Sequence, residues 1–330
     1  MRGSLMRLFT LAQHQQVLGE AACNVAAAAS YNWMLPEGSK IVISRQNVKY
    51  WRKLFADNGG NMAKTDRELK QERVLRAPDP VPQGIPANHG EFNPGRVYER
   101  IMHIPDQHAP YQHRDTIPFL AAVAAAFQPD LIVNAGDETD KHAMSFHDSD
   151  PNLDSAGAEL EKAKVFLAAL AALFPQQLLC DSNHGSMHYR KAKAHGIPVQ
   201  YLKTYRDILF PSGGGDGWVW AESWRVKTPM GDVLFKHQAS GSVLVDAAHN
   251  QCNLMVGHNH GNYSVEYSAS SACLYWGAYG GCLIDKDSLA FAYGKHTLRK
   301  PVLGCSVILL GRPMLIPMVL DEEGRWVGEL

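Results

Sequence analysis

From about residue 96 onward, apolar residues fall into short runs, separated by longer alanine-rich stretches. Five runs have the length and composition of buried strands: 98–104, 131–135, 177–180, 232–236 and 253–256. Two of the intervening segments, 115–127 and 156–174, carry alanine and other apolar residues typical of buried helices. Strands and helices that alternate in this way are typical of a largely parallel sheet, so the pattern predicts an α/β domain.

The first sixty residues show helical periodicity only. Residues 8–29 carry an apolar stripe at three- and four-residue spacing. A further helix is predicted at 45–55, with Ser44 as its N-cap and Trp51 on its inward face. Residues 1–60 are therefore expected to form a small helical domain.

No period persists between these two regions. Residues 65–76 are strongly charged, and prolines crowd the stretch that follows: Pro78, Pro80, Pro82, Pro86 and Pro94. Such a composition is typical of a semi-stiff tether. We therefore expect a Pro-rich charged linker at 61–95 and the α/β domain at 96–330.

Composition limits the classes of partner. The 32 basic and 33 acidic residues nearly balance, so a nucleic acid would have to be held by a local patch. No segment approaches the roughly twenty apolar residues of a membrane span, and no membrane partner is expected. The six cysteines form no Cys-x-x-Cys pair, which favours reduced thiols and a cytoplasmic location. The fifteen histidines are the unusual feature, because His is the commonest metal ligand.

Metal-binding side chains follow all five predicted strands. In chain order the motifs are Asp106-x-His108, Gly136-Asp137-x-x-Asp140, Asn183-His184, His237 and Gly257-His258-x-His260. Alternate residues of an extended segment point the same way, so each x-spaced pair can face one cation. Any single motif has an ordinary explanation as a turn or a helix cap. Their joint order at five strand ends indicates a metal centre.

The order of these motifs resembles that of the calcineurin-like metallophosphoesterases, a superfamily that includes the Mre11/SbcD-type nucleases, phosphodiesterases and protein phosphatases. The resemblance covers residues 96 to about 300. It implies a four-layer αββα sandwich of two mixed β-sheets, with the site at the strand ends. By position it also implies two sets of ligands and a bridge: Asp106, His108 and His260 for one metal; Asn183, His237 and His258 for the other; Asp137 between them.

The resemblance further implies a mechanism. Two divalent cations, Mn²⁺ before Fe, Zn or Ni, would hold a bridging hydroxide that attacks the phosphodiester. Asp137 is then catalytic as the bridging ligand, and His184 is the general acid or a phosphate-binding imidazole. The chain departs from the family at Gly185, where an acidic residue often follows the Asn-His pair. Three other carboxylates are candidates to orient His184: Asp181, Glu138 and Asp140.

Segments 24–29 and 43–51 resemble the helix-turn-helix of bacterial and phage DNA-binding domains. That resemblance implies DNA contacts by residues on the second helix: Arg45, Gln46 and Lys49, with Arg52 as a further cation. Residues 31–42 depart from the family, which has a tight turn there. The alternative is a helical docking domain whose cations form a solvated face.

Together these patterns predict a dinuclear-metal phosphodiesterase that acts on DNA as a nuclease, brought to its substrate by the N-terminal helices. The alternative is a small-molecule phosphoesterase, for a cyclic nucleotide, a nucleotide or another diester, with an N-terminal domain that makes a homo-oligomer. A DNA-binding module with a purely structural metal is disfavoured, since structural sites are usually closed tetrahedra of Cys and His.

Overall fold

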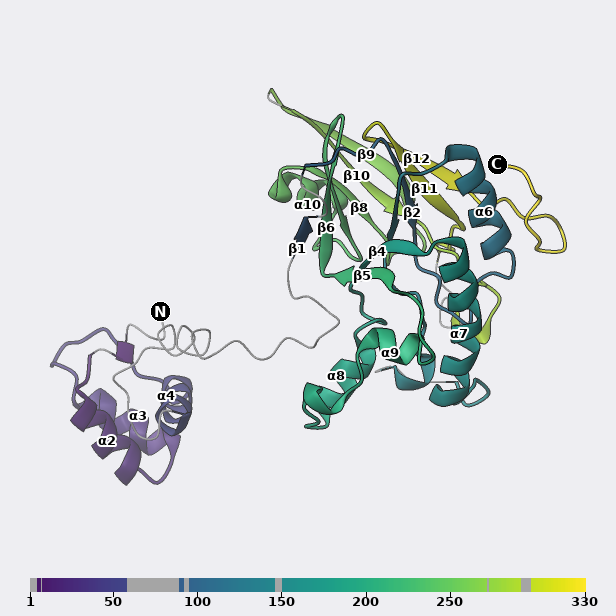
Figure 1. Ribbon diagram of the computed structural model, residues 1–330. Coiled ribbons are helices and arrows are strands. Elements are labelled where there is room, and N and C mark those ends of the chain that lie inside the picture. Colours follow the sequence, from purple (N-terminus) through teal and green to yellow (C-terminus); the bar gives the residue numbers. More distant parts are fainter. Residues whose placement is uncertain are drawn as a thin grey trace. The chain divides into compact units, whose positions relative to one another are not determined.

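The computed structural model describes residues 5–6, 8–57, 89–91, 95–145, 150–271, 273–291 and 298–330 (Figure 1). The chain divides into two compact units, Met1–Pro80 and Val81–Leu330. Most of the expected linker at 61–95 lies outside the described residues. One part of it, His89–Glu91, is not a tether but strand β1 of the second unit.

The described part of the first unit contains three helices: α2 (Leu11–Glu20), α3 (Asn24–Trp33) and α4 (Arg45–Asp57). The expected apolar stripe over 8–29 is thus divided between two helices. The core of the unit is aromatic. The rings of Tyr31 and Trp51, both fully buried, meet edge to face at 5.0 Å, and the Nδ1 atom of His14 lies 2.7 Å from the Tyr31 hydroxyl. Such pairs add about 0.5–1.5 kcal/mol to the burial of their apolar surface.

A long connection joins α3 to α4. The Asn32 side chain closes it by bonding both backbone groups of Ile43, with its amide donating at 2.9 Å and its carbonyl accepting at 2.7 Å. The predicted N-cap is confirmed, because the Ser44 hydroxyl accepts from the Asn47 backbone N–H at 3.3 Å. The helices are therefore joined by a long loop that the Asn32 side chain holds in place, rather than by a tight turn.

Two six-stranded mixed sheets make up the second unit. The first has the order β12 (Arg312–Pro317), β11 (Gly304–Leu309), β2 (Arg100–Ile104), β3 (Leu131–Asn134), β4 (Gln176–Cys180) and β5 (Gly217–Ala221). The second has the order β1, β6 (Ser223–Thr228), β7 (Gly231–Lys236), β8 (Asn253–Val256), β10 (Leu274–Gly280) and β9 (Tyr263–Ala269). Strands β2 to β5 are parallel, as are β7 and β8.

Alternate residues of the strands face two different apolar cores. Ile101 and Val133 of the first sheet pack against Phe235 of the second. Met102, on the opposite face of β2, packs with Leu120 and helices α6 (Thr116–Phe127), α7 (Ala156–Leu173) and α9 (Tyr205–Leu209). Helix α10 (Val243–Asn250) covers the outer face of the second sheet (Figure 1). The expected four-layer αββα sandwich is confirmed.

The sandwich brings the motif-bearing loops together. The last residues of β2, β3 and β4 are adjacent in the parallel part of one sheet, and those of β7 and β8 are adjacent in the other sheet. Ligand sites in parallel α/β sheets lie beyond these carboxyl ends. The remaining short elements follow the same loops: η1 (His142–Met144), α8 (Met187–Ala194) and η2 (Val199–Tyr201).

Two further predictions concern the whole chain. All six cysteines are free, and none forms a disulfide. Among the described residues, no helix has both the length and the apolar character needed to cross a membrane.

Candidate metal centre

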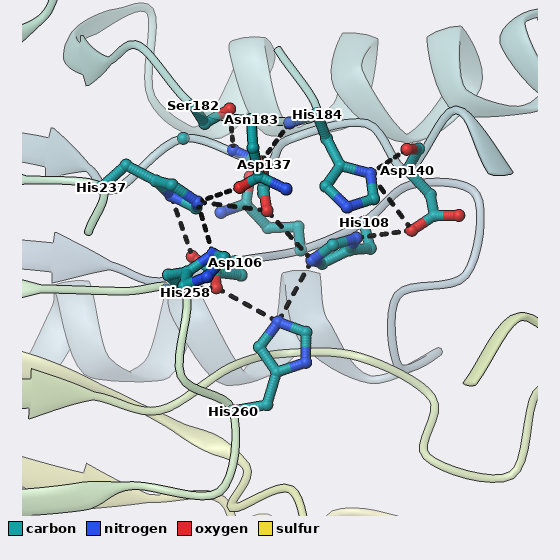
Figure 2. A network of polar contacts seen from close by, with 12 residues as sticks. Asp106, His108, Asp137, Asp140, Ser182, Asn183, His184, His237, His258 and His260 are labelled. Carbon is teal, nitrogen blue, oxygen red and sulfur yellow. Dashed lines mark hydrogen bonds and ion pairs between the residues drawn. The ribbon is translucent and has the colours of Figure 1, made fainter. Parts of the chain in front are cut away.

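Asp106, His108 and His260 form a first cluster (Figure 2). The Nε2 atom of His260 lies 3.2 Å from Asp106 Oδ2 and 3.2 Å from His108 Nε2. The three side chains can offer ligand atoms that all lie within 4.8 Å of one another. Two imidazole nitrogens and a carboxylate that converge in this way suit a divalent cation.

Asp137, His237 and His258 form a second cluster, and Asn183 lies against it. The Nε2 atom of His237 is 3.1 Å from His258 Nδ1 and 2.6 Å from Asn183 Oδ1. All four side chains come from different loops of the two sheets. The sequence prediction had placed these residues around one metal, with Asp137 as the bridge.

Asp137 lies between the clusters. Its Oδ2 atom is 3.4 Å from His108 Nε2 in the first and 3.4 Å from His237 Nε2 in the second (Figure 2). Its Oδ1 atom accepts a hydrogen bond from the His184 backbone N–H at 3.0 Å. One carboxylate oxygen therefore faces both clusters while the other is fixed by the backbone.

Two histidines are oriented through their second nitrogen. The Nδ1 atom of His237 lies 3.0 Å from the Ala135 carbonyl oxygen, and that of His108 lies 2.6 Å from Asp140 Oδ1. With Nδ1 as the donor in both rings, the Nε2 atom carries a lone pair that faces the cluster. Metal-ligating histidines are held in this way in known metal sites. The role of Asp140 beside His108 was not predicted from the sequence.

The backbone is strained at the ligands. His108, Asp137 and His258 have φ values of 53°, 49° and 64°, in the left-handed region that non-glycine residues seldom adopt. Each costs about 1–3 kcal/mol, and such residues cluster at functional sites. Gly257 has another role, because a Cβ atom there would lie 2.3 Å from Asp106 Oδ1. Without that atom the carboxylate can lie against the loop, where the His258 N–H donates to Asp106 Oδ2 at 2.6 Å.

Two buried carboxylates carry the negative charge of the centre. Burial by itself raises the pKa of Asp137, but the nearby imidazoles of His237, His184 and His108 outweigh it and hold the pKa well below its ordinary value. Burial opposes ionisation of Asp106 too, and the hydrogen bond with His260 lowers the pKa despite it. Asp106 Oδ1 is buried with no hydrogen-bond partner among the described residues. A buried anionic oxygen of this kind fits a bound cation.

His184 lies at the edge of the centre, with its side chain 20% exposed. Its Nδ1 atom bonds the Asp140 carbonyl oxygen and lies 3.7 Å from Asp140 Oδ1. Burial lowers the pKa of His184, but the carboxylates of Asp137 and Asp140 more than compensate and raise it above the ordinary value. The other two candidate carboxylates bond elsewhere: Asp181 accepts from the Ser182 N–H and Glu138 from the Trp220 indole.

Lys141 is a further residue that the sequence did not single out as part of the site. Its Nζ atom donates to the carbonyl oxygens of His184 and Gly185, at 2.7 Å each. It also lies 4.2 Å from the centre of the Tyr205 ring. The ammonium group thus joins the loop after Asp137 to the loop that carries Asn183.

The expected DNA-contact residues lie in the first unit, on α4. Arg45, Gln46 and Lys49 are exposed. Arg52 is used within the domain, because its guanidinium donates to the carbonyl oxygens of Leu18 at 2.8 Å and Ala21 at 2.6 Å. Those carbonyls are at the end of α2, where a helix leaves acceptors without partners. Arg52 therefore acts as a helix cap in this structure.

Comparison with known proteins gives limited matches. No family model and no curated protein matches the sequence. Among solved structures, Vps29 of Chaetomium thermophilum is 13% identical, with a TM-score of 0.36, over 70% of this chain and 93% of its own. A single mutant of Vps29 from Entamoeba histolytica is 10% identical, with a TM-score of 0.33, over 66% and 96%. Vacuolar Protein Sorting 29 from Cryptosporidium parvum is 12% identical, with a TM-score of 0.33, over 67% and 96%.

Proposed function

We propose that residues 96–330 form a calcineurin-like phosphoesterase domain that hydrolyses phosphodiester bonds with two bound divalent cations, and that its substrate is DNA. The observation that carries the proposal is the position of Asp137, whose Oδ2 atom lies 3.4 Å from both His108 and His237. One carboxylate oxygen that faces both clusters would suit a pair of cations about 3.5–4 Å apart.

The donor set fits this cofactor. Asp106, His108 and His260 would hold one cation, and Asn183, His237 and His258 the other, with Asp137 shared. Nitrogen and oxygen donors without thiolate suit Mn²⁺, Fe, Zn or Ni, and we propose Mn²⁺ as the most suitable. When bound, the two cations would neutralise the phosphoryl oxygens and supply hydroxide near neutral pH.

His184 would act on the substrate directly. Its imidazole is partly exposed, and the Asp140 carbonyl and carboxylate hold its Nδ1 atom, which directs the Nε2 atom away from Asp140. The carboxylates of Asp137 and Asp140 raise the pKa of His184. A protonated imidazole can donate to a phosphoryl oxygen or give its proton to the leaving oxygen.

DNA as the substrate is supported by the first unit. The exposed side chains of Arg45, Gln46 and Lys49 lie on the first turns of α4, as a recognition helix would present them. Arg45 and Lys49 supply the positive charge that phosphate contacts need.

The test uses the full chain, stripped of metal and then supplied with Mn²⁺. We expect hydrolysis of bis(p-nitrophenyl) phosphate to disappear on stripping and to return with Mn²⁺, faster than hydrolysis of p-nitrophenyl phosphate. A gel assay then tests single- and double-stranded DNA. A diester that is cleaved equally well without metal contradicts the metal-centre proposal. Diester cleavage with intact DNA would assign the domain to a small phosphodiester instead.

A further inference from the structure

A basic segment directly follows the Asn183-His184 motif. Residues 182–206 contain no acidic residue and five cations: Arg190, Lys191, Lys193, Lys203 and Arg206. The whole chain, by contrast, has 32 basic and 33 acidic residues. The positive charge of this segment is therefore local, and a local patch is what a near-neutral protein needs in order to bind a polyanion.

The segment is attached to the metal centre. Helix α8 begins at Met187, and the Arg190 guanidinium donates to the Asn183 carbonyl oxygen at 3.2 Å. Figure 1 shows α8 and α9 together at one end of the second unit. Arg190, Lys193 and Lys203 are exposed. Arg206 is used internally, because it bonds the Trp218 carbonyl oxygen.

An exposed aromatic ring lies within the segment. Tyr201, at the end of η2, is 82% exposed, and it precedes Lys203 by two residues. Neighbouring Ile197 is also exposed, at 45%. An exposed ring beside cations is the combination with which proteins bind single-stranded nucleic acid, since bases stack on the ring while phosphates contact the cations.

Cations also lie beside the first cluster. Arg299 bonds the Asn262 side chain, and the Val302 N–H donates to the carbonyl oxygen of His260 at 2.9 Å. Arg299 and Lys300 are exposed. They belong to a stretch that these two contacts hold against the loop of His260, a residue of the first cluster. The centre therefore has basic residues at loops from both clusters, as a strand that runs across it would require.

We propose that the segment 187–203 is a binding track for single-stranded nucleic acid, which leads the strand to the metal centre. Arg190, Lys193 and Lys203 contact successive phosphates, and a base stacks on Tyr201. This inference rests on the proposed function, because it names the substrate class of the same site. It assigns the single-strand contacts to the second unit, whatever the first unit binds.

The experiment measures the affinity of the full chain for a fluorescent single-stranded oligonucleotide in EDTA, over a series of salt concentrations. For Lys193→Gln/Lys203→Gln we expect about tenfold weaker binding and a salt slope smaller by about 1.4, because two cations are removed. The matched control is Lys227→Gln/Arg312→Gln. Both cations are exposed, and they lie at the edge of each sheet that is distant from the metal centre. The control should therefore bind the oligonucleotide as the unchanged protein does.

A second pair of variants tests the stacking. Tyr201→Ala should weaken binding about fivefold or more. Tyr267→Ala, which removes another exposed tyrosine, should not. Hydrolysis of bis(p-nitrophenyl) phosphate with Mn²⁺ should be unchanged in all four variants, which separates this inference from the proposed function. Unchanged affinity in Lys193→Gln/Lys203→Gln overturns the track. Displacement of the oligonucleotide by polyglutamate, with no effect of Tyr201→Ala, would overturn it in favour of an acidic protein partner.

Discussion

The Nζ atom of Lys141 lies 2.7 Å from the carbonyl oxygen of His184. The contact ties two motif-bearing loops together, and burial lowers the Lys141 pKa to about 8, against the opposing charge of Glu138. Because the ammonium group holds the backbone of the loop, we expect it to fix the positions of Asn183 and His184 rather than to contact the substrate.

Lys141→Met should therefore lower kcat by about tenfold to a hundredfold, since small displacements of catalytic groups have effects of this size. The KM for bis(p-nitrophenyl) phosphate should change little. Steady-state kinetics would check this, with Lys227→Met as the control at an exposed lysine. A large rise in KM with unchanged kcat would mean that Lys141 binds the substrate instead.

Asp140→Asn tests the support of His108. The carboxylate accepts from His108 Nδ1 at 2.6 Å, and an amide would accept less strongly and could present its NH₂ group instead. Loss of such a partner typically weakens metal binding by about tenfold to a hundredfold. A Mn²⁺ titration of hydrolysis should show this shift, and Asp232→Asn, at the far end of β7, should not. Equal Mn²⁺ dependence in the two variants would contradict the assigned role.

Gly257→Ala tests the close packing beside Asp106. The added Cβ atom would lie 2.3 Å from Asp106 Oδ1 and 2.9 Å from Ala135 Cβ. Overpacking of this kind costs about 1–3 kcal/mol of unfolding free energy, and it should also displace a metal ligand. Gly241→Ala is the matched control, because a Cβ atom there meets nothing within 4 Å. Denaturant unfolding and Mn²⁺ titration would measure both effects; equal stability of the two variants would argue against the crowding.

His103 should make stability depend on pH. It is fully buried, neither ring nitrogen has a hydrogen-bond partner among the described residues, and burial lowers its pKa to about 4. In the unfolded chain its pKa is about 6.5. The unfolded state therefore takes up a proton first as the pH falls, and stability is lost between about pH 6.5 and 4, by about 3 kcal/mol.

His103→Leu should remove most of that loss, whereas His195→Leu, at an exposed site, should not. The free energy of unfolding near neutral pH and near the lowered pKa of His103, measured in EDTA, gives the comparison. The same loss on acidification in His103→Leu as in the unchanged protein would show that other groups cause it.

Local pattern predicted the strands and the polar residues at their ends, whereas the sandwich and the division of those residues into two clusters came from the family resemblance. A strand ends where its apolar run ends, so residues such as Asp106 and His258 could be placed at the carboxyl ends of strands. Three-residue β1, in contrast, has no apolar pattern, and it exists only through pairing with β6, which is distant in sequence. The hairpin β9–β10 was also missed, although Tyr263, Val265 and Tyr267 alternate with polar residues as an edge strand does.

The supporting contacts of the site could not be predicted for the same reason. Asp140 reaches His108 across 32 positions of the chain, and Lys141 reaches His184 across 43. Both contacts depend on how two loops pack, which no spacing in the sequence records. Arg52 is a residue for which the sequence predicted a contact that the structure does not leave it free to make in full. It was expected on the DNA-contact face of α4, and its guanidinium instead caps α2.

Asp137→Asn tests whether two cations share the Asp137 carboxylate. We expect the unchanged protein to bind two Mn²⁺ ions per chain and to hydrolyse bis(p-nitrophenyl) phosphate. The variant should lose at least about a thousandfold in kcat, as expected for loss of the two-cation clamp on the attacking and leaving oxygens, and should bind Mn²⁺ more weakly. Hydrolysis by Asp137→Asn at the rate of the unchanged protein would show that catalysis does not depend on a carboxylate shared by two cations.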